Sequence, residues 1–130
     1  MDFRKLLLVL MVVLAGLLAG CASHPALQLG EADAGKTVEL RSGDSLVVSL
    51  KGNITTGFTW VPAAQDPALL KQVGDAVVTP ESDAIGAGGV IVLRFEAVAT
   101  GQTVLRLEYK RPWETDVAPL QTYEVTVVVK

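Results

Sequence analysis

The sequence predicts an all-β domain, a two-sheet antiparallel sandwich of about seven strands. Apolar and polar residues alternate along several short runs, and turn-forming residues separate one run from the next. In the run 103–109, for example, Leu105, Leu107 and Tyr109 share one face, as expected for a half-buried strand. Seven such runs in about a hundred residues indicate a sandwich of immunoglobulin-like character, with a small barrel as the alternative.

The expected elements follow in order along the chain. Turn residues at 42–44, 52–53, 100–101 and 111–112 separate strands expected at 38–40, 45–50, 58–61, 76–79, 90–98, 103–109 and 123–129. The one expected helix covers residues 66–72, because Asp66 can cap it and Pro67 suits the first helical position. In the last strand the expected inward residues are Tyr123, Val125, Val127 and Val129.

Residues 1–20 have the pattern of an export signal. Arg4 and Lys5 precede an apolar run, and small residues come directly before Cys21. The sequence Leu-Ala-Gly-Cys at 18–21 resembles the bacterial lipobox, in which the cysteine is lipidated and becomes the first residue of the mature chain. An ordinary signal peptide with a chance cysteine is the alternative. Since Cys21 is the only cysteine, it has no disulfide partner within the molecule.

The lipid would attach the mature chain to a membrane. Residues 21–36 mix small and polar residues without a period and are expected to form a lipidated tether, leaving 37–130 as one domain that is large enough to fold as a monomer. Ala22 after Cys21 resembles the pattern of outer-membrane sorting in Gram-negative bacteria. We therefore expect an exported, lipid-anchored protein at the outer membrane, on its periplasmic or surface face.

Composition argues against several classes of function. Without the leader the chain carries nine basic and thirteen acidic residues and no basic stripe, so no nucleic-acid partner is expected. The only histidine, His24, lies in the expected tether, and the domain has no cysteine. Neither a nucleophile–histidine pair nor a zinc site can form there, so we expect no enzyme, no metal and no cofactor. The carboxylate pairs Glu81/Asp83 and Glu114/Asp116 match no calcium loop and are expected to be solvated.

Three short motifs lie at turns between expected strands, where binding residues are commonly found. Each has a structural explanation when taken alone, because asparagine and glycine suit turns and the glycine-rich run lacks the lysine and following helix of a phosphate loop. Exposure of Trp113 behind a rigid proline is costly unless the ring meets a partner. Together the motifs indicate a binding surface: Asn53-Ile54-Thr55-Thr56-Gly57-Phe58, Gly86-Ala87-Gly88-Gly89 and Arg111-Pro112-Trp113.

In order, spacing and strand context these motifs resemble the chagasin family of cysteine-peptidase inhibitors, over most of residues 37–130. The family pattern is an Asn-Pro-Thr-Thr-Gly-Tyr-like loop, a Gly-x-Gly-Gly loop and an Arg-Pro-Trp-like loop on an immunoglobulin-type sandwich. Two positions depart from it: Ile54 replaces the usual proline, which removes rigidity, and Phe58 replaces the usual tyrosine, which loses a hydroxyl.

The resemblance implies reversible inhibition of papain-like cysteine peptidases by a wedge of three loops that occupies the catalytic cleft. Carried over, Thr55, Thr56 and Gly57 would approach the catalytic thiolate. Residues 86–89 would lie along the cleft and pair through their backbone. Trp113 would pack on an apolar patch, oriented by Pro112, with Arg111 adding a hydrogen-bonding fork.

Two other classes of function remain open on the sequence. One is a glycan or cell-wall binding module that uses Trp60 and Trp113, although Trp60 is better placed for the core. The other is a structural lipoprotein.

Overall fold

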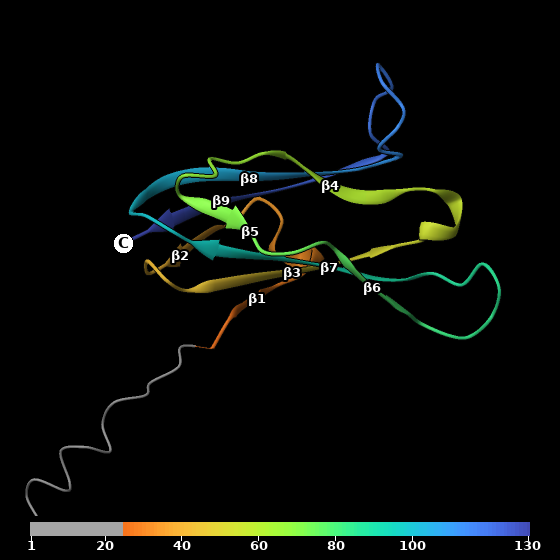
Figure 1. Ribbon diagram of the computed structural model, residues 1–130, viewed down its shortest axis with the longest axis horizontal. Coiled ribbons are helices and arrows are strands. Elements are labelled where there is room, and N and C mark those ends of the chain that lie inside the picture. The colour runs from red at the N-terminus through yellow and green to blue at the C-terminus, as the bar shows by residue number, and fades with distance from the viewer. Residues whose placement is uncertain (1–24) are drawn as a thin grey trace, which may run out of the picture.

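The computed structural model describes residues 25–130, which form two β-sheets packed face to face (Figure 1). The predicted leader, Cys21 and His24 lie outside the described residues. All seven predicted strands are present, and the prediction of an all-β sandwich is confirmed. The strands of the described part are β1 (Leu27–Leu29), β2 (Thr37–Leu40), β3 (Ser45–Gly52), β4 (Thr59–Ala64), β5 (Leu70–Gln72), β6 (Val77–Pro80), β7 (Gly89–Ala97), β8 (Gly101–Lys110) and β9 (Gln121–Val129), with two short 3-10 helices, η1 (Glu31–Asp33) and η2 (Ile54–Thr56).

The two sheets are mixed rather than purely antiparallel. One sheet has the order β1-β3-β7-β5, with β6 also paired to β7, and the other has the order β2-β9-β8-β4. Strands β1 and β3 are parallel, as are β2 and β9, and the remaining pairs are antiparallel. Alternation along a strand is the same for both kinds of pair, so the sequence pattern cannot distinguish them.

The core lies between the sheets and follows the predicted alternation. Leu105, Leu107 and Tyr109 of β8 are buried, and so are the four predicted inward residues of β9. Phe95 of β7 is among the largest fully buried side chains. Each such residue stabilises the fold by about 1.5–3 kcal/mol relative to an exposed position. This packing makes the sandwich a rigid base for the loops that it carries.

The predicted helix at 66–72 is wrong. Asp66 does act as a cap, because its Oδ1 accepts a hydrogen bond from the Ala68 N–H at 2.9 Å and its carbonyl oxygen accepts from Leu69 and Leu70. The turn then ends, since Leu70 is fully buried and pairs with Ala97 in the first sheet. So short a segment gains little as an isolated helix, and the sheet hydrogen bonds and burial of Leu70 outweigh it.

The domain also begins earlier than the sequence predicts. The described part of the expected tether, residues 25–36, packs on the sandwich: β1 pairs with β3, and Leu29 is buried. The Tyr123 hydroxyl donates a hydrogen bond to the Gly30 carbonyl oxygen at 2.9 Å. Burial, together with the nearby Asp33 carboxylate, raises the pKa of Tyr123 to about 12. A three-residue strand is too short for its alternation to be noticed in the sequence.

Strand register brings the three predicted motifs to one end of the sandwich, on the right in Figure 1. Gly89 pairs with both Gly52 and Pro80, which places the chain after β3 beside the β6–β7 connection. Thr59 pairs with Lys110, which places the β8–β9 connection beside both. Strand β1 runs parallel to β3, so residue 27 lies toward the other end.

In the described part of the chain, no helix is long and apolar enough to cross a bilayer.

Candidate functional site

Three loops form the candidate site. We call residues 53–58 the first loop, residues 81–88 the second loop and residues 111–120 the third loop. The first contains η2, the second joins β6 to β7, and the third joins β8 to β9. Twelve of the thirteen predicted contact positions lie in these loops, and the remaining one, Gly89, begins β7 directly after the second loop.

Asn53 organises the first loop. Its Oδ1 accepts hydrogen bonds from the Thr55 backbone N–H at 3.1 Å and from the Thr55 hydroxyl at 2.6 Å, in the manner of a helix N-cap. The Thr56 hydroxyl donates to the Asn53 carbonyl oxygen at 2.7 Å. On its other side, Asn53 Nδ2 donates to the Gly86 carbonyl oxygen at 2.9 Å, which ties the first loop to the second. One side chain thus sets the shape of the first loop and its distance from its neighbour.

Tyr109, at the end of β8, holds Asn53 in place through a hydrogen bond. The sequence analysis did not identify Tyr109 as a site residue. The Asn53 backbone N–H donates to the Tyr109 hydroxyl at 2.9 Å. The Tyr109 ring also lies 5.5 Å from the Phe58 ring and 5.2 Å from the Trp60 ring, measured between centroids. A tyrosine at the end of an inward-facing series, next to a loop motif, is the only signal that could have marked it.

Gly57 ends η2 and receives Trp113. Its φ of 85° is left-handed, and its N–H donates to the Ile54 carbonyl oxygen at 2.9 Å. A Cβ at position 57 would collide with the Trp113 ring, so the glycine is required both by its backbone conformation and by this contact. Trp113 still leaves 68% of its surface exposed. The ring is therefore positioned by the first loop and free to meet a partner.

Arg111 connects the first and third loops. Its Nε donates to the Thr56 carbonyl oxygen at 2.9 Å, and Nη1 pairs with the Glu114 carboxylate at 3.1 Å. The guanidinium carbon also lies 4.5 Å from the centre of the Phe58 ring, a cation–π contact. The Arg111 guanidinium, which was expected to bind a partner, thus makes most of its contacts within the molecule. Glu114, expected to be a solvated charge, is instead the partner of Arg111.

A tight turn presents Trp113. The Glu114 N–H donates to the Arg111 carbonyl oxygen at 3.1 Å, which makes Pro112 the first central residue of a four-residue turn. Proline is favoured there because its ring already fixes φ. The third loop closes where the Leu120 N–H donates to the Tyr109 carbonyl oxygen at 2.9 Å.

The second loop is shaped by its glycines. The Ala87 N–H donates to the Ala84 carbonyl oxygen at 3.1 Å, and Gly86 takes the left-handed position of this turn with φ 79°. Gly88 accepts a hydrogen bond from the Glu81 N–H at 3.0 Å. Gly89 sits against the β6 backbone, where a Cβ would lie 2.5 Å from the Thr79 carbonyl oxygen. The role of Gly89 is therefore close strand packing.

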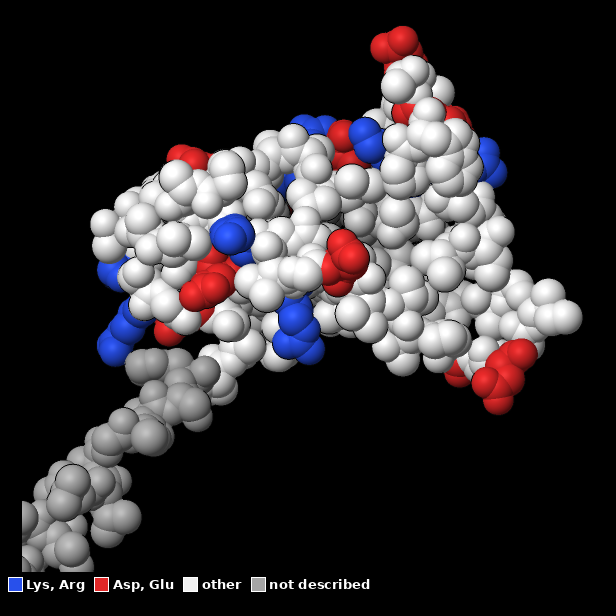
Figure 2. Space-filling view, viewed as in Figure 1, with Lys and Arg blue, Asp and Glu red and all other residues white. Residues whose placement is uncertain are grey.

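On the face shown in Figure 2, the loop end is mostly uncharged, with acidic side chains at its two projecting corners and basic side chains at the base of the upper one. Ile54 and Trp113 are exposed apolar side chains, and Ile85 at the tip of the second loop is fully exposed. The sequence analysis did not identify Ile85. Trp60, by contrast, is buried and its Nε1 donates to the Lys51 carbonyl oxygen at 2.9 Å, as expected for a core residue. Within residues 25–130, no group of three or more His, Cys, Asp or Glu side chains is arranged to hold a metal ion.

A β-sandwich that holds three cross-bonded loops at one end, with an exposed tryptophan among them, is a loop-based binding protein. A model of the chagasin family of peptidase inhibitors, family I42, matches residues 39–127. The chain belongs to this family of cysteine-peptidase inhibitors, and it is an inhibitor rather than an enzyme.

Curated relatives agree with this assignment. Amoebiasin-2 of Entamoeba histolytica is 25% identical over 95 residues, which are 72% of this chain and 77% of the relative. Chagasin of Trypanosoma cruzi is 30% identical over 83 residues, which are 61% of this chain and 76% of chagasin.

Solved structures share the fold. The crystal structure of the cysteine protease inhibitor EhICP2 from Entamoeba histolytica matches with a TM-score of 0.72 and 23% identity, over 84% of this chain and all of that one. PbICP-C, in its complex with falcipain-2, matches with a TM-score of 0.52 and 18% identity, over 85% of this chain and 95% of that one.

Proposed function

We propose that the three-loop end fills the active-site cleft of papain-like cysteine peptidases and that the chain, acting as a monomer, inhibits them reversibly by occupying the cleft. The observation that carries this proposal is the bracing of the site: Asn53 joins the first loop to the second, and Arg111 joins the first loop to the third. The relative PbICP-C was solved in complex with falcipain-2, which supports a peptidase as the partner.

The first loop is suited to approach a catalytic thiolate without being cleaved. A peptidase cleaves a segment that lies extended in its cleft. Residues 54–56 instead form a 3-10 turn that is closed by the Gly57 N–H and capped by Asn53. Extending this turn would break those hydrogen bonds, so Thr55 and Thr56 can sit near the thiolate in a geometry that does not present a scissile bond.

Bracing also favours tight binding. Association costs free energy when mobile loops and side chains become ordered, and that cost falls when the loops are already held in place. Trp113 is held against Gly57 before any partner arrives, and Arg111 is held by Thr56 and Glu114. We therefore assign Arg111 to positioning the loops, and Trp113 to direct contact with an apolar surface of the peptidase.

A panel of papain-like peptidases tests the proposal. We expect the wild-type chain to inhibit at least one member with fast, competitive and reversible kinetics. Thr56→Trp should abolish most of this inhibition, because a large ring would crowd the approach to the thiolate. Size-exclusion chromatography should show a monomer and a one-to-one complex. If no peptidase of the panel is inhibited, and a glycan or cell-wall polymer is bound instead, the cleft-filling proposal fails.

We also propose that Cys21 is lipidated and anchors the chain to a bacterial outer membrane. The lipobox-like residues 18–21 support this, and the position of β1 makes it compatible with inhibition. Because β1 begins at residue 27 toward the end opposite the loops, an anchor at Cys21 would leave the loops pointing away from the bilayer. Labelling with a palmitate analogue should mark the wild type and fail on Cys21→Ser; label retained on that variant would refute the anchor.

A further inference from the structure

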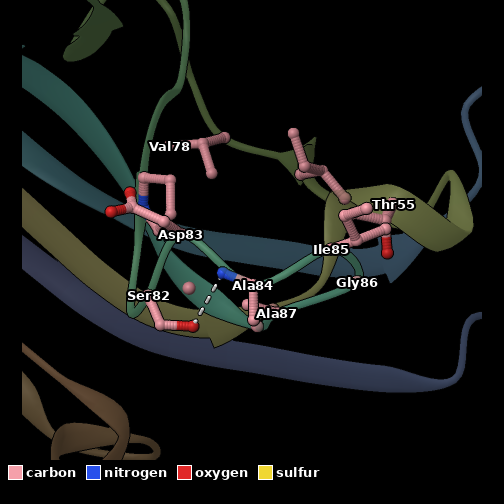
Figure 3. A pocket seen from close by; sticks show the side chains of 13 residues that line it. Thr55, Val78, Ser82, Asp83, Ala84, Ile85, Gly86 and Ala87 are labelled. Carbon is pink, nitrogen blue, oxygen red and sulfur yellow. Dashed lines mark hydrogen bonds between the residues drawn. The ribbon is translucent and has the colours of Figure 1, made fainter.

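A groove of about 390 Å³ lies between the first and second loops (Figure 3). Ile54 and Thr55 form one side, and Val78 and Pro80 of β6 form the other. The second loop curves around the groove from Ser82 onward. Its volume is well above the roughly 30 Å³ that one water molecule occupies in the liquid. The groove is thus large enough for a long side chain of another protein.

Several glycines belong to the lining of the groove. Gly52, Gly88 and Gly89 contribute backbone to its lining and no side chain. At position 52 a Cβ would lie 2.6 Å from the Ile91 side chain, and at position 89 it would meet the β6 backbone. Gly52 and Gly89 therefore let the strands beneath the groove pack closely, while exposed residues of the first and second loops form its rim.

The lining combines aliphatic walls with a single charge. Ile54, Val78, Pro80 and Ile85 supply apolar surface, and Asp83 is the only charged residue that lines the groove. Within residues 25–130, the Asp83 carboxylate has no hydrogen-bond or ion-pair partner. Lys51 and Glu81 line the adjoining hollow instead. An exposed, unpaired carboxylate at the rim of an apolar groove is complementary to a side chain with an aliphatic stem and a cationic end.

We propose that this groove receives a lysine or arginine side chain from the wall of the peptidase cleft, with its stem against Ile54 and Val78 and its charge beside Asp83. The inference rests on the proposed function, because it requires the loop end to be the inhibitory surface. Thr55 belongs to both the groove and the segment expected to face the thiolate, so the groove is continuous with that surface. The basic residue would accordingly lie on the cleft wall that the second loop meets.

An apolar occupant is the competing possibility, and charge distinguishes the two. Burying Asp83 against an apolar side chain would remove water from the carboxylate without providing a partner, which costs free energy. A cation avoids that cost and adds an attraction that salt weakens. The two occupants therefore predict opposite effects of neutralising Asp83.

The test measures inhibition constants for the full chain, purified in mild detergent, against each peptidase that the wild type inhibits. With a basic occupant, Asp83→Asn should raise the inhibition constant about two- to fivefold at low salt, and Asp83→Lys about tenfold. Both differences should shrink in roughly 0.5 M salt. Ile85→Ser, which removes an exposed wall without touching the core, should weaken inhibition by a smaller factor that salt does not change.

Glu96→Gln is the matched control. It makes the same change of charge on β7, opposite Ser45 and away from the loops, and should leave the inhibition constant unchanged. An Asp83→Asn variant that inhibits every target as well as wild type, or better, would overturn the basic occupant, and a loss confined to Ile85→Ser would indicate an apolar one. If the wild type inhibits and the groove variants inhibit equally well, this inference alone is rejected. If the wild type inhibits no peptidase, the proposed function is rejected together with this inference.

Discussion

The first and second loops lie side by side but are held in different ways. In the first loop, the N–H groups of Thr55, Thr56 and Gly57 all donate hydrogen bonds within the loop, and both threonine hydroxyls do the same. The second loop is closed by two backbone bonds and a long contact of 3.3 Å between the Ala84 N–H and the Ser82 hydroxyl. The proposed wedge would therefore have a central loop that is fixed before binding and a flanking loop that can adapt.

The third loop is held less firmly than the first loop and more firmly than the second. Its base is fixed by Arg111 and by the turn that holds Trp113, yet Val117 and Leu120 beyond the turn are exposed. The bracing is therefore concentrated where the loops touch one another. Rigid central contacts with adaptable edges are what the proposed cleft-filling function would require.

The largest effect is expected from Trp113→Ala. If the ring is the main apolar contact of the wedge, its loss should weaken inhibition by about 2 kcal/mol or more, which is roughly a thirtyfold rise in the inhibition constant. Thermal melting should barely change, because most of the ring is exposed. Lys71→Ala, on β5 away from the loops, is the control. A folded Trp113→Ala variant with wild-type inhibition would remove this residue from the interface.

Asn53→Ala should have the next largest effect, since it removes the cap of η2 and the bond to Gly86 together. We expect a stability loss of about 1 kcal/mol and a rise of about tenfold in the inhibition constant. Ser82→Ala breaks a comparable contact in the second loop and should cost less than about 0.5 kcal/mol. Denaturant melts and inhibition assays on both variants measure this. Equal effects would show that the two loops are not held differently.

Amide hydrogen exchange of the wild-type chain should show that the first loop is held more firmly than the second. Thr55 and Gly57 donate their N–H groups within the first loop, whereas those of Asp83 and Ile85 make no hydrogen bond among the described residues. We expect Thr55 and Gly57 to exchange several-fold more slowly than Asp83 and Ile85. Similar rates in the two loops would contradict the idea of a fixed centre and an adaptable flank.

The smallest effect is expected from Ile54→Pro, which restores the usual residue of the family pattern. Asn53 is extended, with φ −130° and ψ 99°, and Ile54 begins η2, so the backbone suits a proline. Within residues 25–130 the Ile54 N–H makes no hydrogen bond that would be lost. Stability should rise by about 0.4–1 kcal/mol, because the unfolded chain loses freedom. A lower melting temperature would show that the first loop does not tolerate this rigidity.

Much of the site could be predicted from the sequence, because its motifs act locally. Asparagine, glycine and proline favour particular backbone shapes wherever they occur, so Asn53, Gly57 and Pro112 could be assigned to turns. The contact roles were less predictable. Arg111 has a fork suited to a partner, but only the structure shows that the fork binds Thr56 and Glu114. Tyr109 could be predicted as core, while its hydrogen bond to Asn53 could not.

The sequence by itself determined the all-β class, seven of the strands, the inward faces of β8 and β9 and the three loop motifs. These depend on neighbouring residues, since alternation and turn chemistry are properties of short segments. Tertiary structure decided the parallel pairs, the strand at Leu70 in place of a helix, the docking of β1 and the partners of the loops. Asn53 and Gly86 are 33 residues apart, and Arg111 and Thr56 are 55 apart. Contacts over such separations exist only after the strands have paired, so strand register, and no local pattern, assembles the three-loop site.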